Sequence, residues 1–460
     1  MKELLIISLL GIAVLALDIL KMRKMVMPVI VLGLLGLIGV SIADWGRNEV
    51  PFAAYGGMLT FDNTALAFTI IFALLGVFWI ILAGDYYAAS TSKRTDIFAL
   101  VLFSMCGAVV LSAYTNLVML FLGVEILSIP VYVLAASNRK NVLSNESGFK
   151  YFFLGSLASA VLLFGISLTY GAVGSFDLQS IQQHLEGGYY SPMLLMGTAM
   201  MLVGFTFKIS VAPFHFWAPD VYQGAPTPIT AYMATIVKGA AFAGMYKLFG
   251  SALQPLPTAY ITAMVLMVAL TLIVANLMAL VQTNAKRMLA FSGISHAGFM
   301  LGFIIAASTT PPVYLMYYTL TYGVASMVAF FVVQQVAAMQ ADDDSVDAFK
   351  GLIKRSPVMA VSMTIALLSM AGIPPLSGFL AKYYVITNMI AHEHMPLVII
   401  MILTSAIGAV YYLKLIAHIF TPIENAGRIM ISDSMRRTFI VLSLLTIVLF
   451  FAASLLEVKW

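Results

Sequence analysis

Apolar runs of about twenty residues recur along the whole chain, and short polar segments separate them. An α-helix needs a run of this length to cross the hydrocarbon core of a bilayer. The pattern predicts about fourteen spans. They lie near residues 4–20, 25–43, 64–83, 97–113, 116–136, 150–173, 192–212, 229–249, 258–281, 287–307, 312–339, 357–390, 397–420 and 438–456. We therefore expect an all-α polytopic membrane protein.

Prolines interrupt two of these runs. The run 357–390 is too long for one straight helix and contains Pro374 and Pro375, and Pro213 follows the run that begins at residue 192. Proline lacks the N–H that an interior helical position donates, so we expect two broken helices. In both breaks a charged residue stands seven positions after a proline, in PFHFWAPD (213–220) and PLSGFLAK (375–382). This similarity favours an internal repeat.

Composition agrees with a membrane protein. The chain is 62% hydrophobic and 10% charged, with a mean hydropathy of +0.99, whereas soluble domains carry about 25% charged residues. The single cysteine, Cys106, excludes an intrachain disulfide, a cysteine-ligated zinc site and a cysteine-bound iron–sulfur cluster.

The distribution of basic residues predicts the orientation in the membrane. A charge cluster follows the first apolar run instead of preceding it, which is typical of a retained span with its N-terminus outside. With that orientation, nearly all basic loops are cytoplasmic, as the positive-inside rule requires. The cytoplasmic set is Lys21, Arg23, Lys24, Lys93, Arg94, Arg139, Lys140, Lys150, Lys286, Arg287, Lys350, Lys354, Arg355, Arg428, Arg436 and Arg437; the outside keeps Lys2, Arg47 and Lys459, with Lys247 near a span end. Both termini are then periplasmic.

Charged residues inside the predicted spans are the candidates for function. A charge at the centre of a span costs roughly 2.5–3.5 kcal/mol on insertion scales, so each one needs a role or a partner. Glu125 lies five residues before Pro130, and Lys208 lies five residues before Pro213. Lys238 stands mid-span beside Gly239 and Ala240, which leave room for water, and Lys382 follows Pro375 by two turns. A carboxylate stabilises a charged lysine and burial stabilises a neutral one, so Glu125 could switch Lys208 between holding and releasing a proton.

Three further residues have two open interpretations. His215, seven residues after Lys208, and His296, in SGISHAGFM, either relay protons or make structural hydrogen bonds. Lys414 either joins the path or extends its amine to the nearby membrane surface.

Several chemistries find no support in the sequence. It contains no GxGxxG strand–helix unit for NADH and no P-loop for ATP. Its basic patches flank predicted spans, where topology explains them better than nucleic-acid binding does.

Longer stretches resemble a known family. FKISVAPFHFWAPDVYQGAPTPITAYMATIVKGAAF (207–242) resembles the antiporter-like membrane subunits of proton-translocating NADH:quinone oxidoreductase, respiratory complex I, and VYQGAPTPITA is most similar to its subunit N branch. Further similar stretches are NLVMLFLGVEILSIPVYVLAA (116–136), SGFKYFFLGSLASAVLLFGISLTYG (147–171), NAKRMLAFSGISHAGFMLGF (284–303) and AGIPPLSGFLAKYYV (371–385).

The resemblance implies fourteen helices with two inverted five-helix repeats and two broken helices. It divides the chain into helices 1–3 (residues 1–96), a first repeat (97–250), a second repeat (251–420) and a final loop and helix (421–460). It also implies a charge pair between Glu125 and Lys208, a link between two half-channels at Lys238, and a terminal relay at Lys382.

The resemblance further implies partners and cofactors. The chain would be a proton-translocating subunit in a bacterial inner membrane, among other complex I membrane subunits. NADH, FMN, iron–sulfur clusters and quinone would belong to other subunits, with no redox chemistry in this chain. Two alternatives remain: a subunit of an Mrp-type cation/proton antiporter, and a structural membrane subunit.

Overall fold

The computed structural model describes residues 1–46, 57–87, 94–188, 190–307, 310–340, 343–423 and 427–453. All regular elements in these ranges are helical. The first half contains α1 (Lys2–Ile19), α2 (Val26–Ala43), α3 (Asn63–Tyr86), α4 (Arg94–Ala113), α5 (Leu117–Ala135), α6 (Val142–Val173), α7 (Leu178–Glu186), α8 (Pro192–Lys208), α9 (Trp217–Gly224), α10 (Thr227–Tyr232) and α11 (Lys238–Met245). The second half contains α12 (Thr258–Leu280), α13 (Ala285–Ile305), α14 (Val313–Ala338), α15 (Leu352–Arg355), α16 (Pro357–Ala371), α17 (Ser377–Ala391), α18 (Met395–Phe420) and α19 (Asp433–Ala452).

The helices agree with the predicted spans. Ten described helical stretches are long and apolar enough to cross a membrane, and α8 and α16 are shorter apolar helices. Their shortness follows from the two expected breaks, because α8 ends before Pro213 and α16 ends before Pro374. The span 229–249 is one helical stretch from Thr227 to Ala252, with π-helical segments at Met233–Val237 and Tyr246–Ala252.

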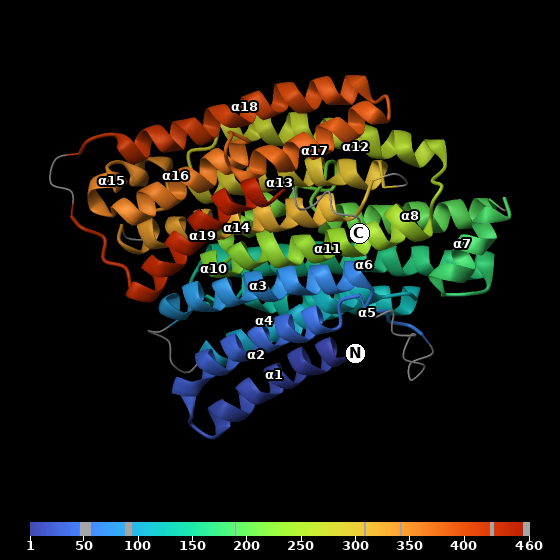
Figure 1. Ribbon diagram of the computed structural model, residues 1–460, viewed down its shortest axis with the longest axis horizontal. Helices are drawn as coiled ribbons and strands as arrows, with labels where there is room; N and C mark the ends of the chain where they lie inside the picture. The colour runs from blue at the N-terminus through green and yellow to red at the C-terminus, as the bar shows by residue number, and fades with distance from the viewer. Residues whose placement is uncertain are drawn as a thin grey trace.

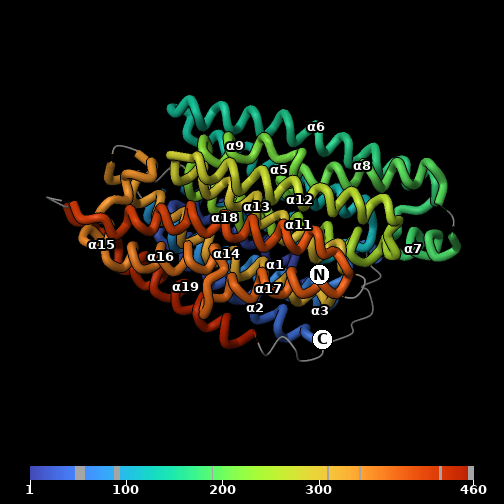
Figure 2. The backbone as a smooth tube through the Cα atoms, turned by 90° about the horizontal axis from the view of Figure 1, so that it is seen from above, coloured from blue at the N-terminus to red at the C-terminus, as the bar shows by residue number. Residues whose placement is uncertain are grey.

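The helices lie side by side along one common direction, which is horizontal in Figure 1. The short helix α15 lies at one end of this bundle, and α7 lies at the opposite end in both views (Figures 1 and 2). Loops at the α15 end are tied together by contacts such as Ile429 N to the Arg355 carbonyl, 3.0 Å. The predicted outside residues Arg47 and Lys459 and the predicted inside residue Lys93 lie outside the described part of the chain.

Two matching loop contacts support an inverted repeat. Asn116 caps α5 and forms an antiparallel bridge with Asp177, and Asn284 caps α13 and forms the same bridge with Ser345. The bridged residues are 61 positions apart in both cases. The first bridge adjoins α7, whereas the second lies shortly before α15, so the two occupy opposite ends of the bundle (Figure 1). This opposite placement is what an inverted repeat requires.

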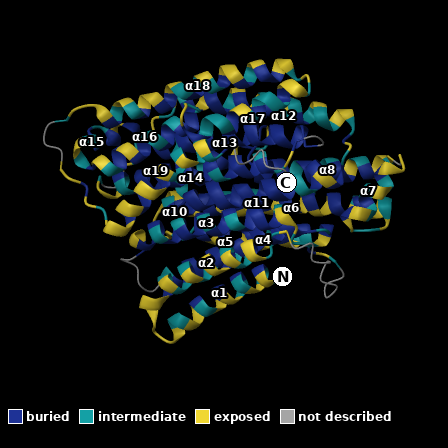
Figure 3. Cartoon of the chain, in the orientation of Figure 1, coloured by how far each residue is buried: buried dark blue, intermediate teal, exposed yellow. Residues whose placement is uncertain are grey.

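Burial divides the bundle into central and peripheral helices. All of α13 except Arg287 and most of α14 are buried, while α1, α2, α6, α12, α18 and α19 each expose an apolar face (Figure 3). Such faces are stable where lipid or another membrane protein covers them.

Candidate functional site

Lys208 is the last residue of α8 and lies directly before the first break. Its side chain is buried, and its amine donates hydrogen bonds to Ser128 Oγ at 2.9 Å and Tyr132 Oη at 2.8 Å. Both partners belong to α5. The amine lies 5.3 Å from the centre of the Tyr132 ring, on the side of the phenol oxygen that it bonds.

Glu125 lies on the same helix, one turn before Ser128, and is half-buried. Its Oε1 is buried and has no hydrogen-bond partner among the described residues. No ion pair joins it to Lys208 in that part of the chain, so the structure differs from the expected direct pair. The reason is geometric: Ser128 and Tyr132, farther along α5, take the lysine amine instead. An orphaned buried carboxylate oxygen costs about 1–3 kcal/mol, and it leaves Glu125 able to accept a proton or a new partner.

Lys238 directly follows the π-helical segment Met233–Val237 and is 3% exposed. Its amine donates to the Gly293 carbonyl on α13 at 2.8 Å. A Cβ at Gly293 would lie 3.3 Å from this amine and 2.7 Å from Tyr322 Oη, so a larger residue there would displace the phenol and crowd the amine. Lys238 therefore meets α13 at a position built for close approach.

His296 lies one turn after Gly293 on the same helix. Its Nδ1 is 2.8 Å from Tyr318 Oη, its Nε2 is 3.3 Å from Tyr412 Oη, and its ring centre lies 4.8 Å from that of Tyr322. A small cavity beside the imidazole has room for about one water molecule. His296 thus connects α13, α14 and α18 in the interior.

Lys382 lies on α17, after the second break. Its amine donates to the Ala371 carbonyl at 3.1 Å and to Ser405 Oγ at 3.0 Å, and it lies 5.3 Å from the centre of the Phe299 ring. Ala371 is the last residue of α16, where helix carbonyls lack an intrahelical donor. The break therefore supplies an oxygen that a lysine amine can use.

Two predicted residues stay apart from these contacts. His215 is buried within the first break, but its Nδ1 has no partner among the described residues. Lys414 is exposed on α18, which fits the surface-extending interpretation better than a place in the interior.

The comparisons with known proteins agree with this architecture. The family described as NADH:quinone oxidoreductase/Mrp antiporter, transmembrane region, matches residues 114–408. NADH-quinone oxidoreductase subunit N of Flavobacterium psychrophilum is 40% identical over 422 residues, which cover 92% of this chain and 91% of the relative. The chain belongs to this family. It is a member on the subunit N side, as its relatives at this identity carry that name.

Solved structures show the same fold. A chain of respiratory complex I from Thermus thermophilus is 32% identical, with 98% of each chain covered and a TM-score of 0.84. A chain of the Mrp complex from Dietzia sp. is 19% identical, covers 99% of this chain and 95% of its own length, and has a TM-score of 0.87. The second likeness concerns the fold alone.

The sequence alone did not identify the neutral side chains that bond the buried Lys208, His296 and Lys382. Ser128 and Ser405 bond lysine amines, and the phenols of Tyr132, Tyr318 and Tyr412 bond a lysine or a histidine. Ser128 and Tyr132 follow Glu125 by three and seven residues, so they share its helical face. That spacing is a signal that could have identified them.

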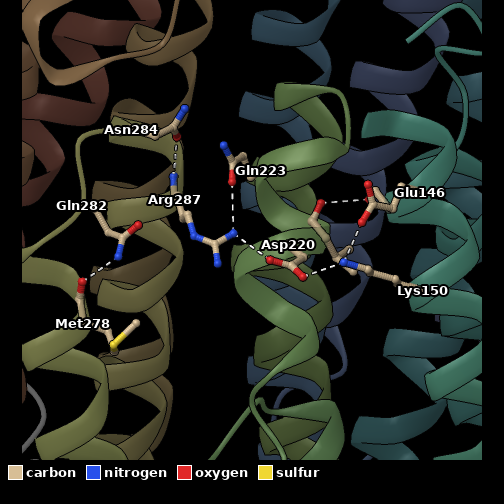
Figure 4. A network of polar contacts seen from close by, with 10 residues as sticks. Glu146, Lys150, Asp220, Gln223, Met278, Gln282, Asn284 and Arg287 are labelled. Atoms are coloured by element: carbon tan, nitrogen blue, oxygen red, sulfur yellow. Dashed lines mark hydrogen bonds and ion pairs between the residues drawn. The ribbon is translucent and has the colours of Figure 1, made fainter. Parts of the chain in front are cut away.

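A surface ion cluster joins the two halves of the chain near one end of the bundle. Asp220 on α9 lies 2.7 Å from Lys150 on α6 and 2.7 Å from Arg287 on α13, and Lys150 also pairs with Glu146 at 2.6 Å (Figure 4). These contacts fit a structural staple.

Lys286, predicted to lie in a loop before the span 287–307, is already part of the helix. It lies in the first turn of α13, is 4% exposed, and donates to the Ala225 carbonyl at 2.5 Å. Ala225 follows the end of α9, so this lysine holds the segment between α9 and α10.

Proposed function

We propose that this chain is the proton-translocating membrane subunit N of NADH:quinone oxidoreductase. The observation that carries the proposal is a row of buried polar groups through the middle of an otherwise apolar bundle. Lys208 and Lys382 lie at the helix breaks, Lys238 follows a π-helical segment, and His296 lies within α13. Backbone carbonyls or hydroxyls are within hydrogen-bond reach of each of them.

The chemistry of this row suits proton transfer. A buried lysine whose partners are neutral can lose its proton without breaking an ion pair, because hydroxyls and carbonyls tolerate both states. Glu125 lies one turn before Ser128, a partner of Lys208, and its Oε1 has no partner among the described residues. When ionised it would stabilise the charged lysine, and its protonation would favour loss of the lysine proton. His215 would sit toward the inner side of Lys208, while Lys414 has a peripheral place.

The proposal includes topology and organisation. The basic loops would face the cytoplasm and both termini the periplasm of a bacterial inner membrane, as the positive-inside rule predicts. The proposed units are residues 1–96, 97–250, 251–420 and 421–460. Electrons would pass from NADH through FMN and iron–sulfur clusters to quinone in other subunits of the complex. The chain itself would carry out no redox step.

Proton pumping during NADH oxidation in inverted membrane vesicles tests the proposal. Lys208→Ala and Lys382→Ala are compared with wild type at matched assembly of the complex, and Lys414→Ala serves as an exposed control. We expect both buried variants to lose pumping and the control to keep it. Unchanged pumping in both would make the buried charges structural.

An Mrp-type cation/proton antiporter subunit is the second candidate, because the fold is shared with that complex. Sodium-dependent proton exchange by the chain in membranes without the redox subunits would favour it. The subunit N names of relatives at 40% identity favour the first candidate.

A further inference from the structure

An open groove of about 350 Å3 runs along the outer surface of the bundle between α16 and α19. Its walls are aliphatic and comprise Val358, Val361, Ile365, Ile440, Leu444 and Ile447. On each helix these residues follow at intervals of three or four, so each wall is a continuous stripe. Val361 and Leu444, at mid-groove, are 48% and 55% exposed.

The floor of the groove offers no polar group that needs a partner. Ser362 Oγ on α16 donates to the Phe439 carbonyl at 3.4 Å, and Ser443 Oγ on α19 donates to the same carbonyl at 2.7 Å. Both hydroxyls are thereby satisfied within the protein. An occupant of the groove meets only methyl and methylene groups, which suits a hydrocarbon chain.

One end of the groove is positively charged. The helices α16 and α19 both begin at the α15 end of the bundle (Figure 1). Arg436 and Arg437 precede Ile440 by four and three residues, hence lie on the groove face of α19, and both are exposed. Lys354, also exposed, precedes α16 by three residues. Two acidic groups lie at this end: Asp433 in the first turn of α19, and Asp85, whose carboxylate accepts a hydrogen bond from Ser432 Oγ at the N-cap of that helix. The three cations outnumber them.

We propose that this groove binds an acyl chain of an anionic phospholipid, with the lipid phosphate beside Arg436 and Arg437. Arginine forms paired hydrogen bonds with phosphate oxygens, and helix N-termini favour an anion electrostatically. The apolar walls begin beside the cationic end and extend away from it along the groove, as the tail of a phospholipid extends from its headgroup. The site lies on the outside of the bundle, apart from the buried lysines, so it stands independently of the proposed function.

Photochemical crosslinking tests the occupant in the assembled membrane complex. A benzophenone amino acid replaces Val361, native membranes are irradiated, and the mass of each adduct on this chain is measured after denaturing separation. The matched position is Leu403, 60% exposed on α18. The Arg436→Gln/Arg437→Gln variant removes the cationic end, and Arg139→Gln/Lys140→Gln removes an exposed basic pair in the α5–α6 loop.

We expect anionic phospholipids to be enriched among adducts at position 361 relative to position 403, by up to about fivefold per arginine. Arg436→Gln/Arg437→Gln should abolish the enrichment, and Arg139→Gln/Lys140→Gln should leave it unchanged. Leu444→Trp, which fills the groove, should lower all lipid adducts at position 361. Equal lipid composition at the two positions, an enrichment that survives loss of both arginines, or adducts with another protein would overturn the proposal.

Discussion

Replacing Gly378 by alanine should force α17 away from α16 at the second break. A Cβ at this position would lie 1.9 Å from the Ser369 carbonyl oxygen and 2.9 Å from Ser369 Oγ. Ordinary contacts begin at 3.4 Å, so the two helices must separate by 3.4 − 1.9, about 1.5 Å. Neither atom can yield easily, because the carbonyl is backbone and the hydroxyl accepts the Gly378 N–H at 3.1 Å.

This displacement reaches Lys382, one turn farther along α17. Its amine bonds the Ala371 carbonyl at 3.1 Å and Ser405 Oγ at 3.0 Å, and a shift of that size breaks at least one of these bonds. Overpacking of a tight contact costs about 1–3 kcal/mol. Misplacement of a functional group by 1 Å can cost about a hundredfold in rate. We therefore expect lower thermal stability together with a large loss of pumping.

The matched control is Gly36→Ala on α2, where a Cβ would meet no atom within 4 Å. Thermal unfolding of the purified complex and proton pumping per NADH oxidised are measured for both variants. If Gly378→Ala resembles Gly36→Ala in both measurements, the close contact between α16 and α17 does not position Lys382, and the argument fails.

Three further predictions concern polar groups. Tyr132→Phe keeps the ring but removes one hydrogen bond to Lys208, so pumping should fall by about tenfold; unchanged pumping would refute a role for the phenol. Asp220→Asn should lower the free energy of unfolding by roughly 1 kcal/mol by breaking two ion pairs, whereas Glu186→Gln on α7 should have no such effect. Burial raises the pKa of the Asp344 carboxyl above 3.8, so its stabilisation is present below pH 3.8 and is lost as pH rises through the raised pKa. Asp344→Asn should weaken the pH dependence of the melting temperature between pH 3.8 and the raised pKa. A variant whose melting temperature changes with pH as that of the wild type does would contradict this.

Elements set by local chemistry were predictable from the sequence. Hydrophobic runs of membrane-spanning length located the helices because a span needs about twenty apolar residues. Pro213 and Pro374 located both breaks because proline removes a helical donor wherever it stands. The cost of burying charge singled out Lys208, Lys238 and Lys382, and all three are buried.

Partner choice depended on the tertiary structure. A membrane span is apolar on both its lipid-facing and its interior side, so periodicity carries little information about which face points inward. The rotation of α5 against α8 decides that Lys208 meets Ser128 and Tyr132, while Glu125 Oε1 has no partner in the described part of the chain. Helix packing likewise buries Lys286 and exposes Lys414. The sequence alone thus determined where the chain crosses, breaks and carries charge, whereas packing among distant helices decided which groups those charges contact.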